Sequence, residues 1–449
     1  MKYVSTRGQA PECGFADVLL SGLAPDGGLY MPSAWPRAGI VPAPYADAAF
    51  HILKHFAGGF SDEELKEDIQ AAYATFDDAR IAPLSEIAPN RYLLELFHGP
   101  TLAFKDIAMQ ILGRMFARAL AKRGARATVL AATSGDTGSA AIAALGGLPN
   151  IELFVIHPHS RVSEVQRRQM TTSPHANVHN IALEGSFDDA QALVKALFAD
   201  TVFAASVNLT AVNSINFARI AAQCVYYFTA TGELGRAAAF VVPTGNFGDV
   251  FAGEAAMRMG LAVEQLVVAT NANDIMARAL NGGIYATGVV RQTLSPSMDI
   301  QVASNFERAL FEASGRDAAY VRDAMAKQPI VLPAPVRAAL AQRYNAFRVD
   351  DDETLAAIAR VHAETGRLID PHTAVGVAAA ERVRSDGPVV VLSTAHPAKF
   401  PDAVRRATGQ IPALPPRLSG LLDAHEKLDV LGADLGLVRR YIAARVPAS

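Results

Sequence analysis

Short apolar runs and longer amphipathic stretches alternate along most of this chain. Apolar runs of strand length, rich in β-branched residues, occupy 128–132, 151–156, 178–183, 238–242, 265–270 and 388–393. Alanine-rich stretches in which apolar residues recur at helical spacing lie between them, for example at 106–123, 187–199 and 214–230. Strands that alternate with helices in this way are typical of α/β folds with parallel sheets. We therefore expect such a fold from about residue 91 onward.

The first 90 residues follow a different pattern. A turn-rich stretch, LAPDGGLYMPSAWP, precedes an acidic amphipathic one, SDEELKEDIQAAYATF. Ser61 can cap a helix at the start of the second stretch, with Glu64 as its capping-box partner. We expect a small leading domain here, and the alanine-rich segment 300–345 with its prolines predicts helical scaffold.

Composition narrows the classes of function. A chain of 449 residues that is 51% hydrophobic is long enough for two or three domains with a cleft between them. The 41 basic and 44 acidic residues nearly balance, so neither nucleic acid nor an anionic membrane is an expected partner. Cys13 and Cys224 form no Cys-x-x-Cys pair, and no His or Cys spacing predicts a metal site. Without a signal-like opening segment or a long apolar stretch, a cytoplasmic location is expected.

Three turns stand where a predicted strand gives way to a helix. They read SGDTG at 134–138, TGNFG at 244–248 and STAHP at 393–397. In an open parallel sheet, such turns line the carboxyl edge where ligands bind. We expect all three to contribute to one site.

The turn TGNFG suits a phosphate group. Its small residues let backbone amides converge, and the helix that follows adds the positive end of its dipole. The turn is neither a Walker loop nor Gly-x-Gly-x-x-Gly. An ordinary βα loop with glycines in a tight turn explains the same residues, so the turn alone leaves both interpretations open.

Lys105 lies at the start of an apolar helical stretch, in FHGPTLAFKDIAMQIL. Apolar neighbours disfavour the charged form of a lysine and lower its pKa, which makes the neutral amine available as a nucleophile. Schiff-base chemistry requires that neutral amine. The alternative is a surface lysine that extends from the first helical turn into solvent.

The string FHGPTLAFKD resembles the segment that carries the Schiff-base lysine of threonine synthases. Further strings of that family occur in the family's order, from residue 5 to residue 400: STRG, LSGLAPDGGLYMP, ATSGDTGSAA, NSINFARI, PTGNFGD and LSTAHPAKF. The resemblance implies an α/β enzyme of fold type II, like the β subunit of tryptophan synthase, with parallel and mixed sheets and flanking helices. It also implies an N-terminal domain at 1–90, a large cofactor-binding domain at 91–130 and 235–449, and a small mobile domain at 131–234.

The same resemblance implies pyridoxal phosphate as the cofactor. Lys105 matches the lysine that binds it covalently, and Thr394 matches the residue whose hydroxyl meets the pyridine nitrogen. The residues expected to form the cup for the cofactor's phosphate are Gly245, Asn246, Phe247, Gly248 and Asp249. A neutral hydroxyl at the pyridine nitrogen would temper the pull of the ring on electrons.

Two other segments match the family's substrate-binding residues. The loop expected to hold the substrate's α-carboxylate comprises Ser134, Gly135, Asp136 and Thr137, and the residues expected to bind its phosphate are Ser214, Asn216 and Arg219. Asp136 would repel a nearby carboxylate, so a helix N-terminus or a cationic ring must offset its charge. The alternative for Asn213 and Ser214 is helix capping, with Arg219 on a solvated face.

The function that the resemblance implies is the last step of threonine biosynthesis, in which O-phospho-L-homoserine loses phosphate from Cγ and gains water at Cβ. Lys105 would move the protons. A lyase or dehydratase acting on serine or threonine would use the same lysine and phosphate cup, and a binding protein without turnover would retain the fold. We expect a small-molecule substrate, structural histidines, and a monomer or homodimer.

Overall fold

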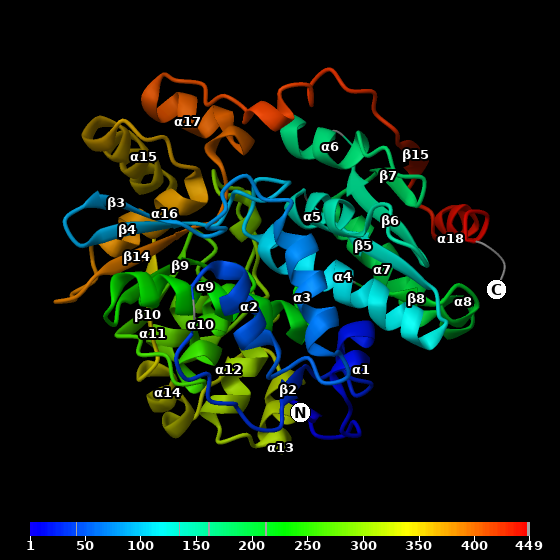
Figure 1. Ribbon diagram of the computed structural model, residues 1–449, viewed down its shortest axis with the longest axis horizontal. Helices are drawn as coiled ribbons and strands as arrows, with labels where there is room; N and C mark the ends of the chain where they lie inside the picture. Colours follow the sequence, from blue (N-terminus) through cyan, green and yellow to red (C-terminus); the bar gives the residue numbers. More distant parts are fainter. Residues whose placement is uncertain (42, 134, 160–161, 212, 447–449) are drawn as a thin grey trace.

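The computed structural model describes residues 1–41, 43–133, 135–159, 162–211 and 213–446. Within these residues the strands form a six-stranded sheet, a five-stranded sheet and two small two-stranded sheets. The two larger sheets lie in opposite halves of the molecule, with helices around each (Figure 1). This arrangement confirms the expected α/β fold with parallel and mixed sheets.

The six-stranded sheet has the order β13-β10-β9-β14-β4-β3 and is parallel except for its β3–β4 hairpin. Its strands are β3 (Leu84–Ala88), β4 (Arg91–Glu95), β9 (Ala239–Pro243), β10 (Gln265–Thr270), β13 (Tyr344–Arg348) and β14 (Val389–Ser393). Alternate residues of β9 face two different hydrophobic clusters: Phe240 and Val242 one, Ala239 and Val241 the other. Both faces are therefore covered, which explains why the strand is a continuous apolar run.

The helices around this sheet pack against one or the other of these two hydrophobic clusters. They are α4 (Lys105–Arg123), α9 (Phe217–Leu234), α10 (Gly248–Arg258), α11 (Ile275–Gly282), α12 (Phe306–Ala313), α13 (Ala318–Met325), α14 (Ala334–Ala341), α15 (Asp351–Thr365), α16 (Pro371–Ala380) and α17 (Pro401–Thr408). Short elements among them are β11 (Ile284–Tyr285), β12 (Ile330–Val331) and the 3-10 turns η1 (Pro296–Met298), η2 (Pro397–Lys399) and η3 (Pro416–Leu418).

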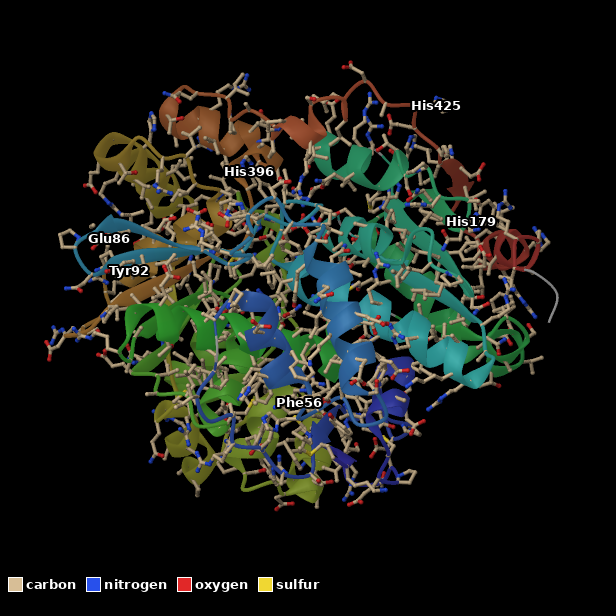
Figure 2. The ribbon with its side chains drawn as sticks, viewed as in Figure 1. Phe56, Glu86, Tyr92, His179, His396 and His425 are labelled. Atoms are coloured by element: carbon tan, nitrogen blue, oxygen red, sulfur yellow. The ribbon has the colours of Figure 1, made fainter. Side chains whose placement is uncertain are left out.

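The five-stranded sheet is parallel and has the order β15-β7-β6-β5-β8. Its strands are β5 (Ala127–Ala132), β6 (Ile151–Pro158), β7 (Val178–Glu184), β8 (Leu209–Thr210) and β15 (Asp429–Gly432). The helices of this half are α5 (Asp136–Leu145), α6 (Glu164–Thr171), α7 (Phe187–Ala199), α8 (Thr201–Ser206) and α18 (Leu435–Ala443). Figure 2 shows His179 of β7 in this half and Glu86 and Tyr92 of the β3–β4 hairpin at the opposite side of the molecule.

The chain returns to the smaller sheet at its C-terminal end, because β15 pairs with β7. The expected ranges assign residues 235–449, and therefore β15, to the large domain. The apolar pattern did not predict this return, since the partly exposed strand lacks the long apolar run of its neighbours.

The N-terminal segment contains β1 (Tyr3–Ser5), α1 (Phe15–Ser21), β2 (Tyr30–Pro32), α2 (Tyr45–Leu53) and α3 (Asp62–Tyr73). The capping box is confirmed: Ser61 Oγ accepts from the amide of Glu64, and the Glu64 carboxylate accepts from the amide of Ser61. The aromatic ring of Tyr3 lies 5.4 Å from that of Phe217 on α9. The buried residues of this segment therefore share one core with α4, α9 and α10. None of the described helices is long and apolar enough to span a membrane.

Candidate active site

A cavity opens at the carboxyl ends of β9 and β14, where the sequence pattern predicted a shared site. It has about 510 Å³ of empty space, part of it open to solvent. The residues that line it are Phe104, Lys105, Asp136, Pro243, Thr244, Gly245, Asn246, Phe247, Asp249, Ser297, Met298, His372, Thr394 and Ala395. All three predicted strand-to-helix turns thus contribute at least one residue to its wall.

Lys105 is the first residue of α4 and its side chain is buried. The loop before it is hydrogen-bonded to the turn after β14: the Phe104 amide donates to the Thr394 carbonyl at 2.8 Å, and the His396 amide donates to Leu102 at 3.0 Å. These bonds hold the segment before Lys105 directly against the turn that contains Thr394. Burial lowers the pKa of Lys105, while the carboxylate of Asp136 opposes that shift.

The turn TGNFG is shaped by close backbone contacts. Phe247 has a left-handed conformation, with φ of 67°, and α10 begins at the next residue. A Cβ on Gly245 would lie 3.1 Å from the carbonyl oxygen of Ser297, which leaves little room for a side chain there. Asn246 Oδ1 accepts from the Gly248 amide at 2.9 Å and thereby holds the turn. A tight turn at the N-terminus of a buried helix matches the predicted phosphate cup.

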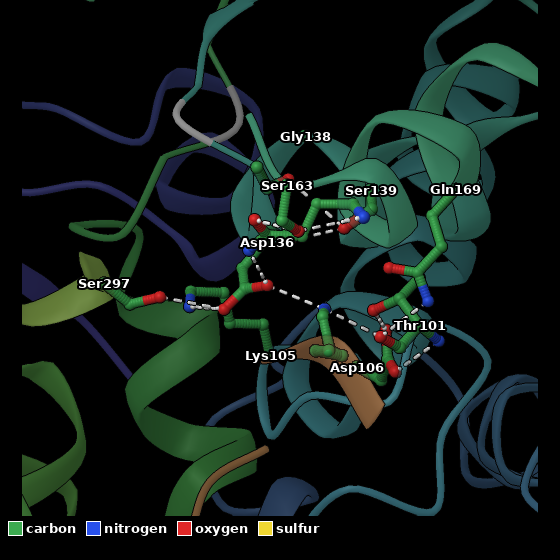
Figure 3. A network of polar contacts seen from close by, with 12 residues as sticks. Thr101, Lys105, Asp106, Asp136, Gly138, Ser139, Ser163, Gln169 and Ser297 are labelled. Atoms are coloured by element: carbon green, nitrogen blue, oxygen red, sulfur yellow. Dashed lines mark hydrogen bonds and ion pairs between the residues drawn. The ribbon is translucent and has the colours of Figure 1, made fainter. Parts of the chain in front are cut away.

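Asp136 is the first residue of α5 and the centre of a polar network (Figure 3). Its Oδ1 accepts from Gln166 Nε2 at 2.8 Å and pairs with Lys399 Nζ at 2.6 Å. Its Oδ2 accepts from Ser297 Oγ at 3.0 Å and from Lys105 Nζ at 3.3 Å. The carboxylate is buried, yet Lys399 and Lys105 together hold its pKa well below the ordinary value.

Asp249 also lines the cavity and has a different environment. Tyr226 and Tyr227 both donate their hydroxyls to its Oδ1, and burial raises its pKa to about 7. Arg219 is buried close enough to act on this carboxyl. Its Nε and Nη1 have no hydrogen-bond partner among the described residues, and burial lowers its pKa to about 10. A buried guanidinium with free donors is what an anionic ligand would satisfy.

The other predicted substrate residues that the structure describes are not part of the cavity lining. Gly135 and Thr137 flank Asp136 at the start of α5, whereas Ser134 lies outside the residues that the structure describes. Ser214 Oγ lies 3.5 Å from Ser304 Oγ. Asn216 caps α9 by accepting from the Ala218 amide, and its Nδ2 donates to the Leu19 carbonyl. Contact of these residues with substrate stays a prediction.

Sequence reasoning missed Lys399 and Ser297. Lys399 ends η2, just after the predicted STAHP turn, so its nearness to that turn was the signal that could have found it. Ser297 lies in η1, in a segment without strand or helix periodicity. Only the tertiary contact with Asp136 reveals its position, and no local pattern in the sequence could have done so.

His372 also lines the cavity, where the sequence predicted only a structural role. Its Nε2 accepts from the Ser297 amide at 3.1 Å, and its Nδ1 lies 2.8 Å from Asp370 Oδ1. Both ring nitrogens therefore have partners, and the bond to the amide makes Nε2 the unprotonated nitrogen. The described residues hold no group of three or more side chains suited to a metal ion.

Family models match most of the chain in three consecutive segments. The threonine synthase N terminus matches residues 2–73, and the pyridoxal-phosphate dependent enzyme family matches 82–334. The C-terminal model of threonine synthase matches 373–442. The second match contains Lys105 and the turn TGNFG.

Named relatives agree with these models. The chain is 50% identical to threonine synthase from Pseudomonas aeruginosa, over 99% of this chain and 98% of the relative. It is equally identical to PLP-bound threonine synthase from Brucella melitensis, whose crystal structure covers 100% of both chains with a TM-score of 0.97. The yeast enzyme's structure is 36% identical and covers 99% of this chain and 98% of its own, with a TM-score of 0.93. The expected fold class, threonine synthase activity and pyridoxal phosphate cofactor are confirmed, and the chain belongs to the threonine synthase family.

Proposed function

We propose that the cavity at Lys105 converts O-phospho-L-homoserine and water to L-threonine and phosphate, with Lys105 as the residue that binds pyridoxal phosphate. The observation that carries this proposal is the buried amine of Lys105 in one cavity with a glycine-rich helix N-terminus and the side chain of Thr394. An amine whose pKa is lowered by burial is suited to attack a carbonyl carbon.

The lining residues fit the cofactor. Gly245 to Asp249 would hold its phosphate at the start of α10, and Thr394 would meet its pyridine nitrogen with a neutral hydroxyl. Pyridoxal phosphate supplies an electron sink for the bonds at the substrate's Cα. The protein supplies the placement: the hydrogen bonds between the loop before α4 and the turn after β14 keep Lys105 and Thr394 at fixed positions on the wall.

Lys105 is also the base that this cavity offers. Once the substrate's amino group has replaced it, the freed amine would remove the proton at Cα and carry further protons at Cβ and Cγ. Asp136 Oδ2, 3.3 Å from Nζ, would accept a hydrogen bond from the amine and hold it in place between these transfers. A lowered pKa helps, because it leaves more of the lysine neutral at physiological pH.

The two ends of the substrate carry negative charge and need separate sites. The N-terminus of α5, with Gly135, Asp136 and Thr137, would receive the α-carboxylate together with Ser134. Ser214, Asn216 and Arg219 would receive the phosphate, and the free donors of the buried Arg219 support this assignment most directly. Stabilising phosphate as it departs would lower the barrier to its elimination.

The setting of the enzyme is a further part of the proposal. The substrate is a small molecule; a cytoplasmic location and a monomeric or homodimeric state are the forms we propose. We also propose two moving parts, built on the six-stranded and five-stranded sheets, that close over the substrate and exclude water until phosphate has left. Light scattering of the purified protein would test the oligomeric state.

Phosphate release and amino-acid formation from O-phospho-L-homoserine test the proposal. The cofactor-loaded protein should release phosphate and form threonine in equal amounts, and Lys105→Ala should lose both. Lys122→Ala is the matched control, because it removes an exposed lysine and should leave turnover unchanged. A wild type that holds cofactor but releases no phosphate, and instead forms 2-oxobutyrate from threonine, would overturn the proposal in favour of a dehydratase.

A further inference from the structure

Lys399 makes the shortest ion pair in the polar network beside the cavity. Its side chain is completely buried at the end of η2. Its Nζ lies 2.6 Å from Asp136 Oδ1 and donates to the Thr101 carbonyl at 2.8 Å. Lys399 follows β14 of the six-stranded sheet, whereas Asp136 follows β5 of the five-stranded sheet. The pair therefore bridges the two halves of the molecule at the cavity wall.

Asp136 has two cationic partners in the structure, and the proposed reaction removes one of them. Lys105 would lose its positive charge each time that its amine gives up a proton to act as a nucleophile or base. Gln166 and Ser297 are uncharged, so Lys399 is then the cation that remains in direct contact with Asp136 among the described residues. An ionised carboxylate buried without a cation would be costly and would tend to take up a proton.

The wider surroundings of this network add charges of both signs. Arg219 on α9 and Asp249 on α10 both interact electrostatically with Lys105. Asp106 on α4 lies close enough to Lys399 to interact with it electrostatically. His372 on α16 lies against Ser297, which in turn donates to Asp136. Lys399 is nonetheless the cation nearest to Asp136, so its removal changes the charge of this wall most directly.

We propose that Lys399 is a positioning residue that keeps Asp136 ionised, fixed and electrically compensated at every stage of turnover. This role rests on the proposed function, in which Asp136 lies beside the substrate's α-carboxylate. With Lys399 paired to Oδ1, the wall carries no net negative charge even when Lys105 is neutral. The substrate's carboxylate can then approach α5 without repulsion, while Oδ2 stays available to Lys105.

The first test is Lys399→Met, which keeps the length of the side chain and removes its charge. Lys399 acts by repulsion to lower the pKa of Lys105, so the variant should raise that pKa. In the cofactor-loaded protein, Lys399 would likewise repel a proton on Nζ of Lys105, where the cofactor would be joined. The visible absorbance, followed during a pH titration, should therefore change at higher pH in the variant than in wild type. The KM for O-phospho-L-homoserine should rise about tenfold or more, because an uncompensated Asp136 repels the substrate.

Two further variants separate charge compensation from packing. Asp136→Asn combined with Lys399→Met removes both charges and should recover a large part of the KM lost in Lys399→Met alone. Lys122→Met is a matched control: Lys122 likewise donates to one carbonyl at 2.8 Å and pairs with one carboxylate at 2.6 Å, but on the exposed surface. It should change neither the absorbance titration nor KM.

Two outcomes would overturn the proposal: an absorbance titration and KM that stay at wild-type values in Lys399→Met, or a double variant with a KM no lower than the single variant's. If Lys399→Met does not fold, the double variant decides. A double variant that folds and binds cofactor supports charge compensation by Lys399, whereas one that fails to fold shows that Lys399 is needed for packing. The absorbance titration needs no turnover, so it tests the electrostatic role of Lys399 even if wild type makes no threonine.

Discussion

Asp136 and Asp249 line the same cavity, and their surroundings contrast. Each is buried in the first turn of a helix that follows a parallel strand, α5 after β5 and α10 after β9. The pKa of Asp136 is held well below its ordinary value, whereas that of Asp249 is raised to about 7. Asp136 contacts two lysines, whereas Asp249 contacts two tyrosine hydroxyls, and the cations Lys105 and Arg219 act on it without a direct ion pair.

The two aspartates show that position at a helix N-terminus does not by itself set the charge of a buried carboxyl. Both receive the favourable helix dipole, so the difference comes from the direct cationic contacts. The wall at Asp136 is suited to a permanent anion that holds a lysine. The wall at Asp249 is suited to a carboxyl that gives up its charge when a phosphate group lies beside it.

The largest effect should come from replacing each aspartate with asparagine. Asp136→Asn leaves Lys399 buried without its carboxylate, which should lower the free energy of unfolding by about 3–5 kcal/mol. Asp249→Asn removes a group that is already close to neutral, so it should lower the free energy of unfolding by less than about 1 kcal/mol at pH 6. Guanidinium unfolding of the cofactor-free proteins measures both.

Glu64→Gln is a control for these variants, because Glu64 pairs with the exposed Lys122. This substitution should lower the free energy of unfolding by less than about 1 kcal/mol. Equal losses for Asp136→Asn and Asp249→Asn would contradict the contrast between the two walls.

A second prediction concerns the cation on the Asp249 side. Arg219→Ala should lower kcat/KM for O-phospho-L-homoserine about 100-fold or more, because phosphate loses a buried donor as it departs. Cofactor affinity should change only a few-fold. Arg219→Lys keeps the charge but not the two-pronged geometry, so its kcat/KM should lie between the values for wild type and Arg219→Ala. Unchanged turnover in Arg219→Ala would remove this residue from the substrate site.

Much of the fold followed from the pattern of apolar residues. The six expected strands all correspond to strands in the structure, because buried parallel strands are continuous apolar runs. Among the strands that the pattern missed, β8, β13 and β15 lie at sheet edges, whereas β4 lies between β14 and β3 inside the six-stranded sheet. Their pairing depends on neighbours that are distant in sequence, which a local pattern does not contain.

The candidate site was predictable in its strand-to-helix turns and less so elsewhere. Lys105, Asp136, Asp249 and Thr394 meet in one cavity as expected, but β5 belongs to a different sheet from β9 and β14, so the turns of two sheets rather than one edge form the site. Ser297 could not be predicted, since its segment lacks periodicity and reaches Asp136 only through tertiary contacts. The sequence indicated that the charge of Asp136 must be offset, and the structure shows that Lys399 provides the cation.

A third prediction uses pH to separate the two walls. The pKa of Asp249 rises on folding from 3.8 to about 7, so its contribution to stability is complete below the first value and is lost as pH rises through the second. Asp136, with a lowered pKa, is ionised in both states above pH 5 and adds no slope there. Between pH 5 and 7, cofactor-free wild type should therefore lose up to about 1.4 kcal/mol per pH unit relative to Asp249→Asn. Parallel stability curves for the two proteins would show that Asp249 does not titrate in this range.

The smallest expected effect concerns how Arg219 is placed on the Asp249 side. Asn216 caps α9, which carries Arg219 in its first turn, so Asn216→Ala should cost about 1 kcal/mol of stability. Asn216→Ser keeps a capping oxygen and should restore most of that loss. Kinetics then decide between the two roles of Asn216. If Asn216 only caps the helix, Asn216→Ser should also restore kcat/KM. If Asn216 binds the substrate's phosphate, kcat/KM should stay low in Asn216→Ser although its stability is restored. The second result would place a further polar donor beside Arg219 and extend the phosphate site along the start of α9.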